Sequence, residues 1–410
     1  MGRRAVVYIS VAAALLGLLS VGTSLTQNSQ ILESATPRTA QAATTESCDA
    51  LFGDPYQNCW AELLNKVSAF EGPTRALAAL HDFSRTRVLL GSMCHELEHS
   101  IGQEAFAVSL DVADAMRHAD TKCQYGYVHG VLESYAKQSS RESVASSFTS
   151  VCGQFNNPED SPLLTVECTH GLGHAASIME SQSMGKAVLL CDLLGAETES
   201  SFYCAGGVLM EYGQSLLKRI SGVGSASSGA HGPGMSVLTP QEERFPCESI
   251  PDRYKSQCWG RISLFWGGEF KDDVDGLIER CSKEAGEWLS LCNRSAGEWV
   301  LRRGQVHPYS GADLREYVIS HCQTAAEEQL GSCLAGAVYG QTLTDIALNS
   351  PIDETLKLCA AVRVARANRE CRAAERAAVM SISDRSLRVS VGADRGFTSA
   401  ELETLEVPDL

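Results

Sequence analysis

The feature that most constrains this chain is the regular spacing of its 16 cysteines. Four neighbouring pairs enclose ten residues each, and three more pairs enclose eleven, twelve and fifteen. An even number of cysteines behind an export-type N-terminus is typical of disulfides formed in an oxidising compartment. Pairing neighbours, and pairing the two cysteines left over with each other, predicts eight disulfides: Cys48–Cys59, Cys94–Cys123, Cys152–Cys168, Cys191–Cys204, Cys247–Cys258, Cys281–Cys292, Cys322–Cys333 and Cys359–Cys371.

The second cysteine of each pair opens a similar segment, as in CTHGLGHAASIM from Cys168 and CAGGVLMEYG from Cys204. A small residue commonly follows two to four positions later, and then apolar residues recur at helical spacing. We call these segments helix openings, and successive helix openings begin 29 to 54 residues apart, mostly 34 to 41. This spacing indicates an internal repeat with the period of a two-helix unit.

We therefore predict an all-α fold of helical hairpins, each linked by a disulfide across its turn. Such a disulfide closes a short loop and stabilises the fold by ~2–3 kcal/mol. A single hairpin cannot bury its apolar face, so we expect the hairpins to stack into an α-solenoid. The architecture is similar to that of Sel1 and tetratricopeptide repeats, although their consensus residues are absent. The alternative is an irregular disulfide-rich domain without a repeat.

The N-terminus has the pattern of an export signal. Residues 1–4 form a basic n-region, and residues 5–22 carry no charge and are long enough to approach the width of a bilayer. An Ala-x-Ala site at 40–42 lies far beyond this apolar run, which favours an uncleaved signal anchor over a cleaved signal peptide. With residues 23–46 as a flexible linker, the chain is expected to be membrane-anchored through this helix with an extracytoplasmic domain, or secreted.

The rest of the chain divides by composition. We expect N-terminal helical repeats over 47–218, a Gly/Ser-rich loop over 219–246, C-terminal helical repeats over 247–381 and an acidic tail over 382–410. The formal net charge of −16 argues against nucleic acid as a partner, because an acidic surface repels phosphates. A solenoid commonly presents its concave face to a protein partner, so such a partner is possible here.

Five of the ten histidines fall in three consecutive helix openings. His95 and His99 are four residues apart, as are His170 and His174, and His129 stands four residues before Glu133. Residues four apart share a helix face, so three stacked helices would bring these six side chains together as metal ligands. The alternative is a hydrogen-bonded polar core. The other histidines have no such pairing: His81, His118, His231, His307 and His321.

The expected cofactor is a divalent transition metal. Neutral imidazoles suit copper, zinc and iron alike, and a carboxylate ligand from Glu133 or Glu96 would also suit manganese. Three tyrosines near the predicted pocket either tune the metal or, as the more usual role of helical aromatics, belong to the core: Tyr125, Tyr127 and Tyr135.

The stretch CHELEHSIGQ from Cys94 contains His-Glu-x-x-His, which in zinc peptidases supplies two ligands and a general base. In that interpretation Glu96 is the catalytic base. However, the metzincin form needs a histidine where Ala105 stands, and no sheet is predicted to hold a peptide. We therefore favour a metal-dependent enzyme of another kind, with a non-catalytic scaffold or metal chaperone as the first alternative and a zinc peptidase as the second.

Overall fold

The computed structural model describes residues 45–403 except 46, 52–53, 120–121, 124, 148–149, 154–161, 182, 222–237, 307–310, 349–357 and 381–384. The chain divides into two compact units, Met1–Leu63 and Leu64–Leu410. This boundary falls inside the segment 47–218 that composition groups together. The predicted n-region and signal segment lie outside the described residues.

The described part of the chain is all-helical and contains no strand, which confirms the all-α part of the predicted fold. The helices are α3 (Asp54–Glu71), α4 (Pro73–Ser84), α5 (Val88–Ser92), α6 (Cys94–Ser109), α7 (Val112–Met116), α8 (Gly126–Gln138), α9 (Arg141–Ser147), α10 (Pro162–Met179), α11 (Met184–Leu190), α12 (Glu199–Ser221), α13 (Pro240–Arg244), α14 (Lys255–Trp259), α15 (Ile262–Phe270), α16 (Val274–Glu284), α17 (Leu289–Val306), α18 (Gly311–Cys322), α19 (Leu330–Leu348), α20 (Leu358–Ala361), α21 (Ala365–Met380), α22 (Arg385–Asp394) and α23 (Ser399–Glu403).

All 16 cysteines are joined in disulfides, and the pairs are those that the spacing predicts. Several of them link the end of one helix to the next α-helix, as Cys281–Cys292 links α16 to α17 and Cys322–Cys333 links α18 to α19. Cys94–Cys123 is different, because it ties the first residue of α6 to the turn that precedes α8.

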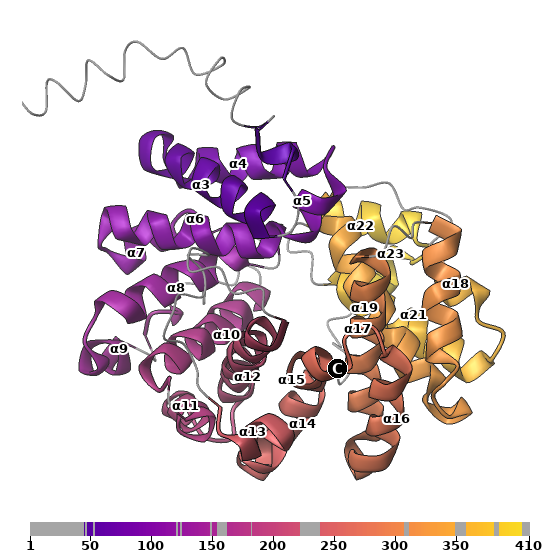
Figure 1. The fold of residues 1–410 in the computed structure, drawn as a ribbon. Coiled ribbons are helices and arrows are strands. Elements are labelled where there is room, and N and C mark those ends of the chain that lie inside the picture. The colour runs from indigo at the N-terminus through magenta and orange to yellow at the C-terminus, as the bar shows by residue number, and fades with distance from the viewer. Residues whose placement is uncertain are drawn as a thin grey trace, which may run out of the picture. The chain divides into compact units, whose positions relative to one another are not determined.

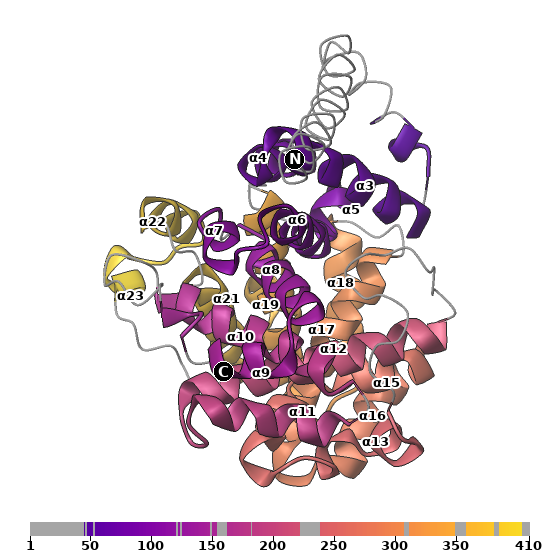
Figure 2. The ribbon, with the colours of Figure 1, turned by 90° about the vertical axis from the view of Figure 1, so that its left-hand side faces the viewer.

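In the second unit the long helices that begin near these cysteines pack against one another in chain order. Contacts run from α6 to α8, α10 and α12, then through α15 and α17 to α19 and α21. Figures 1 and 2 show α6, α8, α10 and α12 side by side. The same unit contains contacts between α19 and both α4 and α5, so segments far apart in sequence meet there.

Glycines allow several neighbouring helices to approach to backbone contact. A Cβ added at Gly173 of α10 would overlap the carbonyl oxygen of Cys204, and one added at Gly207 of α12 would overlap that of His170. Gly297 of α17 and Gly336 of α19 face each other's helix in the same way. Several glycines near the starts of these helices are therefore points of close helix packing.

Two segments differ from the boundaries expected from composition. Helix α12 continues to Ser221 and α13 begins at Pro240, so the segment between them is shorter than 219–246. Past residue 382 the chain forms α22 and α23, where Phe397 and Leu402 pack on Val379 and Met380. Burial of these apolar side chains explains why the C-terminal segment is helical, although its composition predicts only an acidic tail. None of the described helices is sufficiently long and apolar to cross a membrane.

Candidate metal centre

Five histidines from α6, α8 and α10 form one contiguous group, which we call the histidine cluster: His95, His99, His129, His170 and His174. The ring of His129 is central, with centroids 5.1–5.3 Å from those of the other four. The i, i+4 spacing places each pair on one face of its helix, and helix stacking brings the three faces together. All five histidines predicted as ligands therefore meet in space.

The backbone around the start of α8 brings His129 against α6. A Cβ on Gly126 would overlap the carbonyl oxygen of His95, and one on Gly130 would overlap that of His99. Tyr125 caps α8 with a left-handed backbone at φ 60°, an unfavourable conformation for a bulky residue. This turn and the Cys94–Cys123 disulfide fix the two helix openings next to each other.

Hydrogen bonds to backbone carbonyls decide which ring nitrogen of two histidines carries the proton. His95 Nδ1 lies 2.9 Å from the carbonyl oxygen of Cys123, and His129 Nε2 lies 3.1 Å from that of Glu167. A carbonyl only accepts, so these nitrogens donate, and in the neutral rings His95 Nε2 and His129 Nδ1 hold lone pairs. His129 Nδ1 is buried and has no hydrogen-bond partner among the described residues. Both lone pairs are suited to a metal ion.

His99 lies between two acceptors. Its Nε2 is 3.1 Å from His95 Nε2, and its Nδ1 is 2.9 Å from Glu133 Oε1 in an alignment that makes no hydrogen bond. A neutral imidazole carries one proton, so either tautomer of His99 leaves its other nitrogen facing a second acceptor atom at close range. A cation at the cluster, or an additional proton, removes this repulsion.

A carboxylate-rich group adjoins the histidine cluster. His174 Nδ1 donates to Glu211 Oε2 at 2.9 Å and lies 3.5 Å from Glu133 Oε1, and all three side chains are fully buried. Glu133 Oε2 accepts a hydrogen bond of 2.7 Å from Gln103. His174 Nε2 and Glu133 Oε1 are buried without a hydrogen-bond partner in the described part of the chain. Glu211 thus orients His174 with its Nε2 lone pair available.

Ligand atoms in two of these groups are close enough to share an ion. One nitrogen from each of His95, His99 and His129 lies within 4.8 Å of the others, and the same holds for one atom each of Glu133, His174 and Glu211. Burial is the largest factor that lowers the pKa of His95 and of His129, and neighbouring imidazoles lower it further. The rings are thus held neutral, which is the form that binds a metal.

The remaining predicted site residues lie at the edge of these groups. His170 contacts the rings of His129 and His174, and burial followed by neighbouring imidazoles lowers its pKa well below the ordinary value, yet it belongs to neither ligand group. Glu96 is partly buried one residue from His95 and belongs to neither group. Tyr127 is a buried core residue whose hydroxyl donates to the carbonyl oxygen of Ala115, which is the usual role of a helical aromatic residue.

A third group resembles a metal site but has another role. His81, Glu98 and Cys123 lie within 4.8 Å of one another. Cys123 is in a disulfide, so it offers no thiolate ligand. His81 Nε2 is 3.0 Å from Glu98 Oε1, and Glu98 Oε2 accepts from the backbone N–H of Tyr127. This buried pair holds α4, α6 and α8 together and stabilises the fold.

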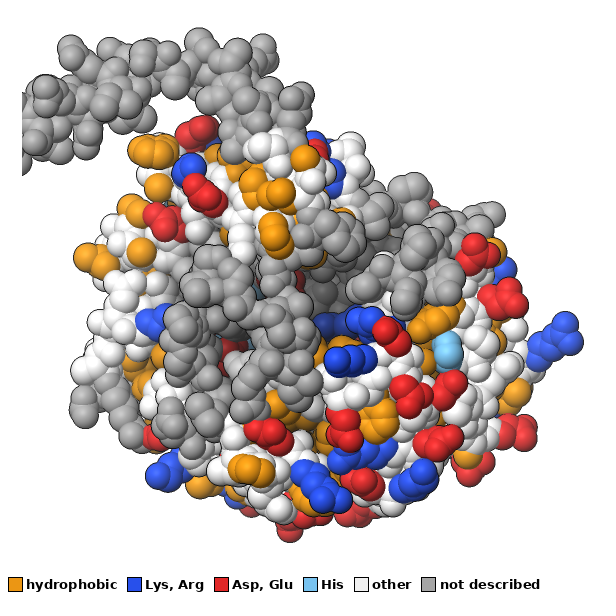
Figure 3. All heavy atoms as spheres, in the orientation of Figure 1, with side chains coloured by type: hydrophobic (Ala, Val, Ile, Leu, Met, Phe, Trp, Pro, Cys, Tyr) orange, Lys and Arg blue, Asp and Glu red, His pale blue; other side chains and the backbone are white. Residues whose placement is uncertain are grey.

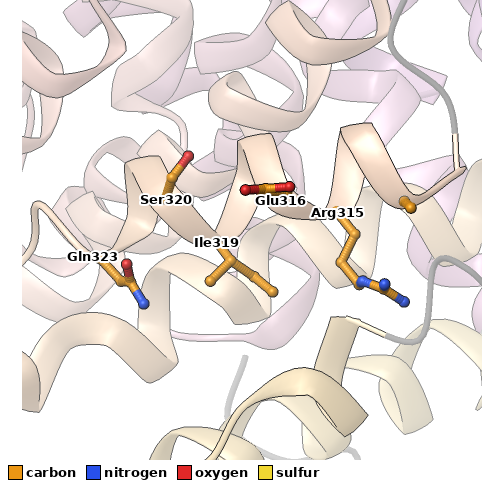
Figure 4. Close-up of a pocket in the computed structure, with 6 residues that line it drawn as sticks. Arg315, Glu316, Ile319, Ser320 and Gln323 are labelled. Carbon is orange, nitrogen blue, oxygen red and sulfur yellow. The ribbon is translucent and has the colours of Figure 1, made fainter.

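One surface pocket lies along α18, away from these groups. Figure 4 shows its lining side chains, among them Arg315, Glu316 and Gln323, all carried by one helix. It contains no histidine or metal-ligand group, and we assign no function to it.

Sequence reasoning based on histidines missed Glu211 and Gln103. A usable signal exists for Glu211, which stands seven residues after Cys204, while His174 stands six residues after Cys168. A comparison of all ligand-type residues within one position of a shared distance from the cysteines would have included it. Gln103 has no such signal, because its hydrogen bond to Glu133 depends on how α6 and α8 cross.

No protein-family model matches the chain, and it matches neither a curated protein nor a solved structure. Its class is therefore defined by its own fold and site. It is a disulfide-rich, all-helical protein with buried histidine and glutamate groups that can hold a metal ion. The eight disulfides indicate an oxidising environment outside the cytoplasm.

Proposed function

We propose that this protein binds a divalent transition metal ion through His95, His99 and His129 and uses it as a catalytic centre. The observation that carries the proposal is the position of His99, whose two ring nitrogens each face another acceptor. The 3.1 Å between His95 Nε2 and His99 Nε2 suits two nitrogens that are each ~2.0–2.1 Å from one ion. Copper, zinc and iron all accept such ligands.

Three features favour catalysis over a purely structural ion. Three histidines leave a coordination position open for water or substrate, whereas structural zinc sites are usually closed by four ligands. His174 Nε2 is a buried lone pair beside this position, available as a fourth ligand or as a proton acceptor. Glu211 acts as the outer carboxylate that fixes the orientation of His174 through a hydrogen bond, and Glu133 places a carboxylate oxygen 2.9 Å from His99 Nδ1.

The proposal keeps Glu96 as a candidate general base but does not support a zinc peptidase. A zincin relies on an edge strand to hold the peptide, and no strand occurs among the described residues. The third ligand proposed here, His129, comes from a helix opening related to that of His95 by the repeat. No observation favours peptide hydrolysis over other metal-dependent reactions.

Elemental analysis of the full-length protein from its native compartment tests the metal proposal. The wild type is expected to hold at least one equivalent of a single transition metal. His99→Ala combined with His129→Ala should reduce this to background, because two of the three ligands are lost. His118→Ala is the matched control, since His118 contacts Thr74 outside the histidine cluster and its loss should leave the metal content unchanged.

A wild type without metal, or a double variant that holds as much as the wild type, would overturn the proposal. Loss of metal in the His118 variant would show that the assay measures folding instead of ligation. A circular dichroism spectrum of each variant checks that the helices remain.

We also propose that the hairpins form an α-solenoid and that the uncleaved N-terminal segment anchors the protein outside the cytoplasm. The chain-order contacts from α6 to α21 support the first point, since each long helix packs on the next. The disulfides and the charge-free run of residues 5–22 support the second.

A further inference from the structure

The carboxylate-rich group of Glu133, His174 and Glu211 has the spacing of a second metal site. One ligand atom from each residue lies within 4.8 Å of the other two. His174 Nδ1 is 2.9 Å from Glu211 Oε2 and 3.5 Å from Glu133 Oε1. Separations of this size suit atoms that each lie ~2.0–2.2 Å from one ion. The three side chains can therefore act as ligands of a single ion.

Three successive long helices supply these ligands, one each. Glu133 lies on α8, His174 on α10 and Glu211 on α12, and α10 packs against both of the other helices. Helix α8 also carries His129, four residues before Glu133, so one face of this helix contributes to both groups. The ring of His174 stacks on that of His129, with 5.1 Å between the ring centroids. The carboxylate-rich group and the histidine cluster are therefore adjacent.

Burial makes a cation favourable at Glu133. Its side chain is fully buried, and its Oε1 has no hydrogen-bond partner in the part of the chain that the structure describes. Its ion-pair partners are the imidazoles of His99 and His174, and no Lys or Arg among the described residues lies within that distance. The histidine seen most clearly in Figure 3 lies over α18, in line with the burial of those on α8 and α10. A buried carboxylate is unfavourable unless a positive charge or a proton neutralises it, and a metal ion supplies that charge.

Glu98 shows how the protein satisfies a buried carboxylate without an ion. Glu98 is as fully buried as Glu133, but its Oε1 lies 3.0 Å from His81 Nε2 and its Oε2 accepts from the backbone N–H of Tyr127. Lys122 Nζ lies 3.4 Å from the other ring nitrogen of His81 and brings a positive charge to this pair. Among the described residues, Glu133 Oε1 has neither a hydrogen bond nor a nearby lysine. The difference points to a ligand at Glu133 that the Glu98 pair does not need.

We propose that Glu133, His174 and Glu211 bind a second divalent metal ion next to the ion held by the histidine cluster. Two carboxylates and one imidazole favour an ion that accepts oxygen ligands, such as manganese, iron(II) or zinc. The second site rests on its own ligands, and only its pairing with the first ion rests on the proposed function. Two adjacent ions form a dinuclear centre, which can polarise a substrate at one ion and activate water at the other.

Binding of the second ion changes the tautomer of His174. In the metal-free protein its Nδ1 donates to Glu211, so the ion takes the position of that proton. The ring stays neutral, and the proton moves to Nε2, which is buried beside the ring of His129. His174 then has an N–H donor in place of a lone pair beside the open position of the first ion. Glu211 orients His174 while only the first ion is bound, and it becomes a ligand when the second ion binds.

Elemental analysis of the full-length protein loaded with zinc tests this proposal. Protein stripped with a chelator is incubated with excess Zn²⁺, desalted and measured for zinc per chain. The wild type is expected to hold two equivalents. Glu133→Gln should hold one, because a neutral amide replaces the carboxylate ligand of the second ion. His95→Ala combined with His129→Ala should also hold one, since only the ligands of the first ion are lost.

Glu98→Gln is the matched control for Glu133→Gln. It removes an equally buried carboxylate outside the histidine cluster and the carboxylate-rich group, and it should leave two equivalents of zinc. His174→Ala removes a different ligand of the second ion and should also hold one equivalent, so it keeps the test valid where Glu133→Gln does not fold. A circular dichroism spectrum of each variant checks that its helices remain.

The zinc content separates the second site from the proposed function. A wild type with one equivalent that is lost in the His95 and His129 variant overturns the second site and leaves the proposed function standing. One equivalent that this variant retains and Glu133→Gln loses overturns the proposed function and leaves the second site standing. Two equivalents in folded Glu133→Gln and His174→Ala, or none in either, overturn the assignment of these ligands, and a wild type without zinc overturns both proposals.

Discussion

The chemistry of the site depends on single nitrogen and oxygen atoms. A carbonyl fixes the proton on His95 Nδ1, another fixes it on His129 Nε2, and a carboxylate fixes it on His174 Nδ1. Each ring then has its lone pair on the opposite nitrogen. The protein thus sets the tautomers of three imidazoles before any ion arrives, which lowers the reorganisation that binding requires.

Glu211 is expected to control metal affinity without being a necessary ligand. Glu211→Ala removes the acceptor that holds His174 Nδ1, and loss of such an outer carboxylate weakens metal binding by about 10–100-fold. Glu211→Gln keeps an acceptor of the same shape and should lose less. Competition with a chromophoric chelator measures both affinities, and an alanine variant that binds like the wild type would contradict this role.

The metal-free protein is expected to lose stability as the pH falls. Burial lowers the pKa of His95, His129 and His170 in the folded state, so between these lowered values and about 6.5 the unfolded chain binds more protons. The free energy of unfolding should therefore decrease steadily below about pH 6.5. Urea unfolding followed by circular dichroism across this range checks the slope, and a flat profile would be inconsistent with buried neutral imidazoles.

Residue spacing predicts part of the site and misses the rest for a physical reason. The i, i+4 histidine pairs are local, so sequence alone places His95 with His99 and His170 with His174. The contact of Glu211 with His174, and of Gln103 with Glu133, depends on how separate helices cross. The angles and positions at which helices cross are set by side-chain packing and are difficult to predict from local sequence patterns.

At the scale of helices, glycines and one disulfide position the site. The backbones of α6 and α8 approach closely near their N-terminal ends, because Gly126 and Gly130 have no side chain that would overlap α6. Without that approach the ring of His129 would stand away from those of His95 and His99. Helix packing therefore determines whether three histidines on two helices can share an ion.

Gly130→Ala is expected to separate these helices. Its Cβ would overlap the carbonyl oxygen of His99, and such overpacking destabilises by about 1–3 kcal/mol. Gly340→Ala is the control, since the atom nearest to its Cβ would be Cδ2 of the Leu301 side chain at 3.3 Å, which can shift by the small amount required. Urea unfolding and metal content are measured on both variants. Equal stability and full metal content in the Gly130 variant would show that the close approach is unimportant.

The Cys94–Cys123 disulfide is expected to support both stability and metal binding. Replacing both cysteines by serine should lower the free energy of unfolding by ~3–4 kcal/mol and weaken metal binding, because the two helix openings are no longer tied. The same change at Cys359 and Cys371 should destabilise similarly but preserve metal affinity, since that pair links α20 to α21. Equal metal affinity in both variants would contradict a special role for Cys94–Cys123.

At the scale of the whole molecule, cysteine spacing predicts the helical class and all eight pairings. Short loops restrict which cysteines can meet, so sequence distance is informative here. The helices past residue 382 and the extension of α12 to Ser221 are not predicted. Composition indicates which segments are exposed to solvent, but it does not show which apolar residues in them will pack together. The contacts of α19 with α4 and α5 are long-range and have no local signature.

The proposed membrane anchor makes a prediction for the intact protein. If residues 5–22 remain attached, the native protein should sediment with membranes after alkaline carbonate washing, and its N-terminal peptide should include residues before position 22. Mass spectrometry of the purified protein identifies that peptide. A soluble product whose N-terminus begins after residue 22 would contradict the anchor and indicate a cleaved signal.

The most direct test of the central claim is X-ray diffraction from crystals of the native, metal-loaded protein, collected at the absorption edge of the metal found by elemental analysis. The account predicts an anomalous peak about 2.0–2.1 Å from a nitrogen of each of His95, His99 and His129. Absence of an anomalous peak at the histidine cluster, or a peak bound only by other residues, would contradict it.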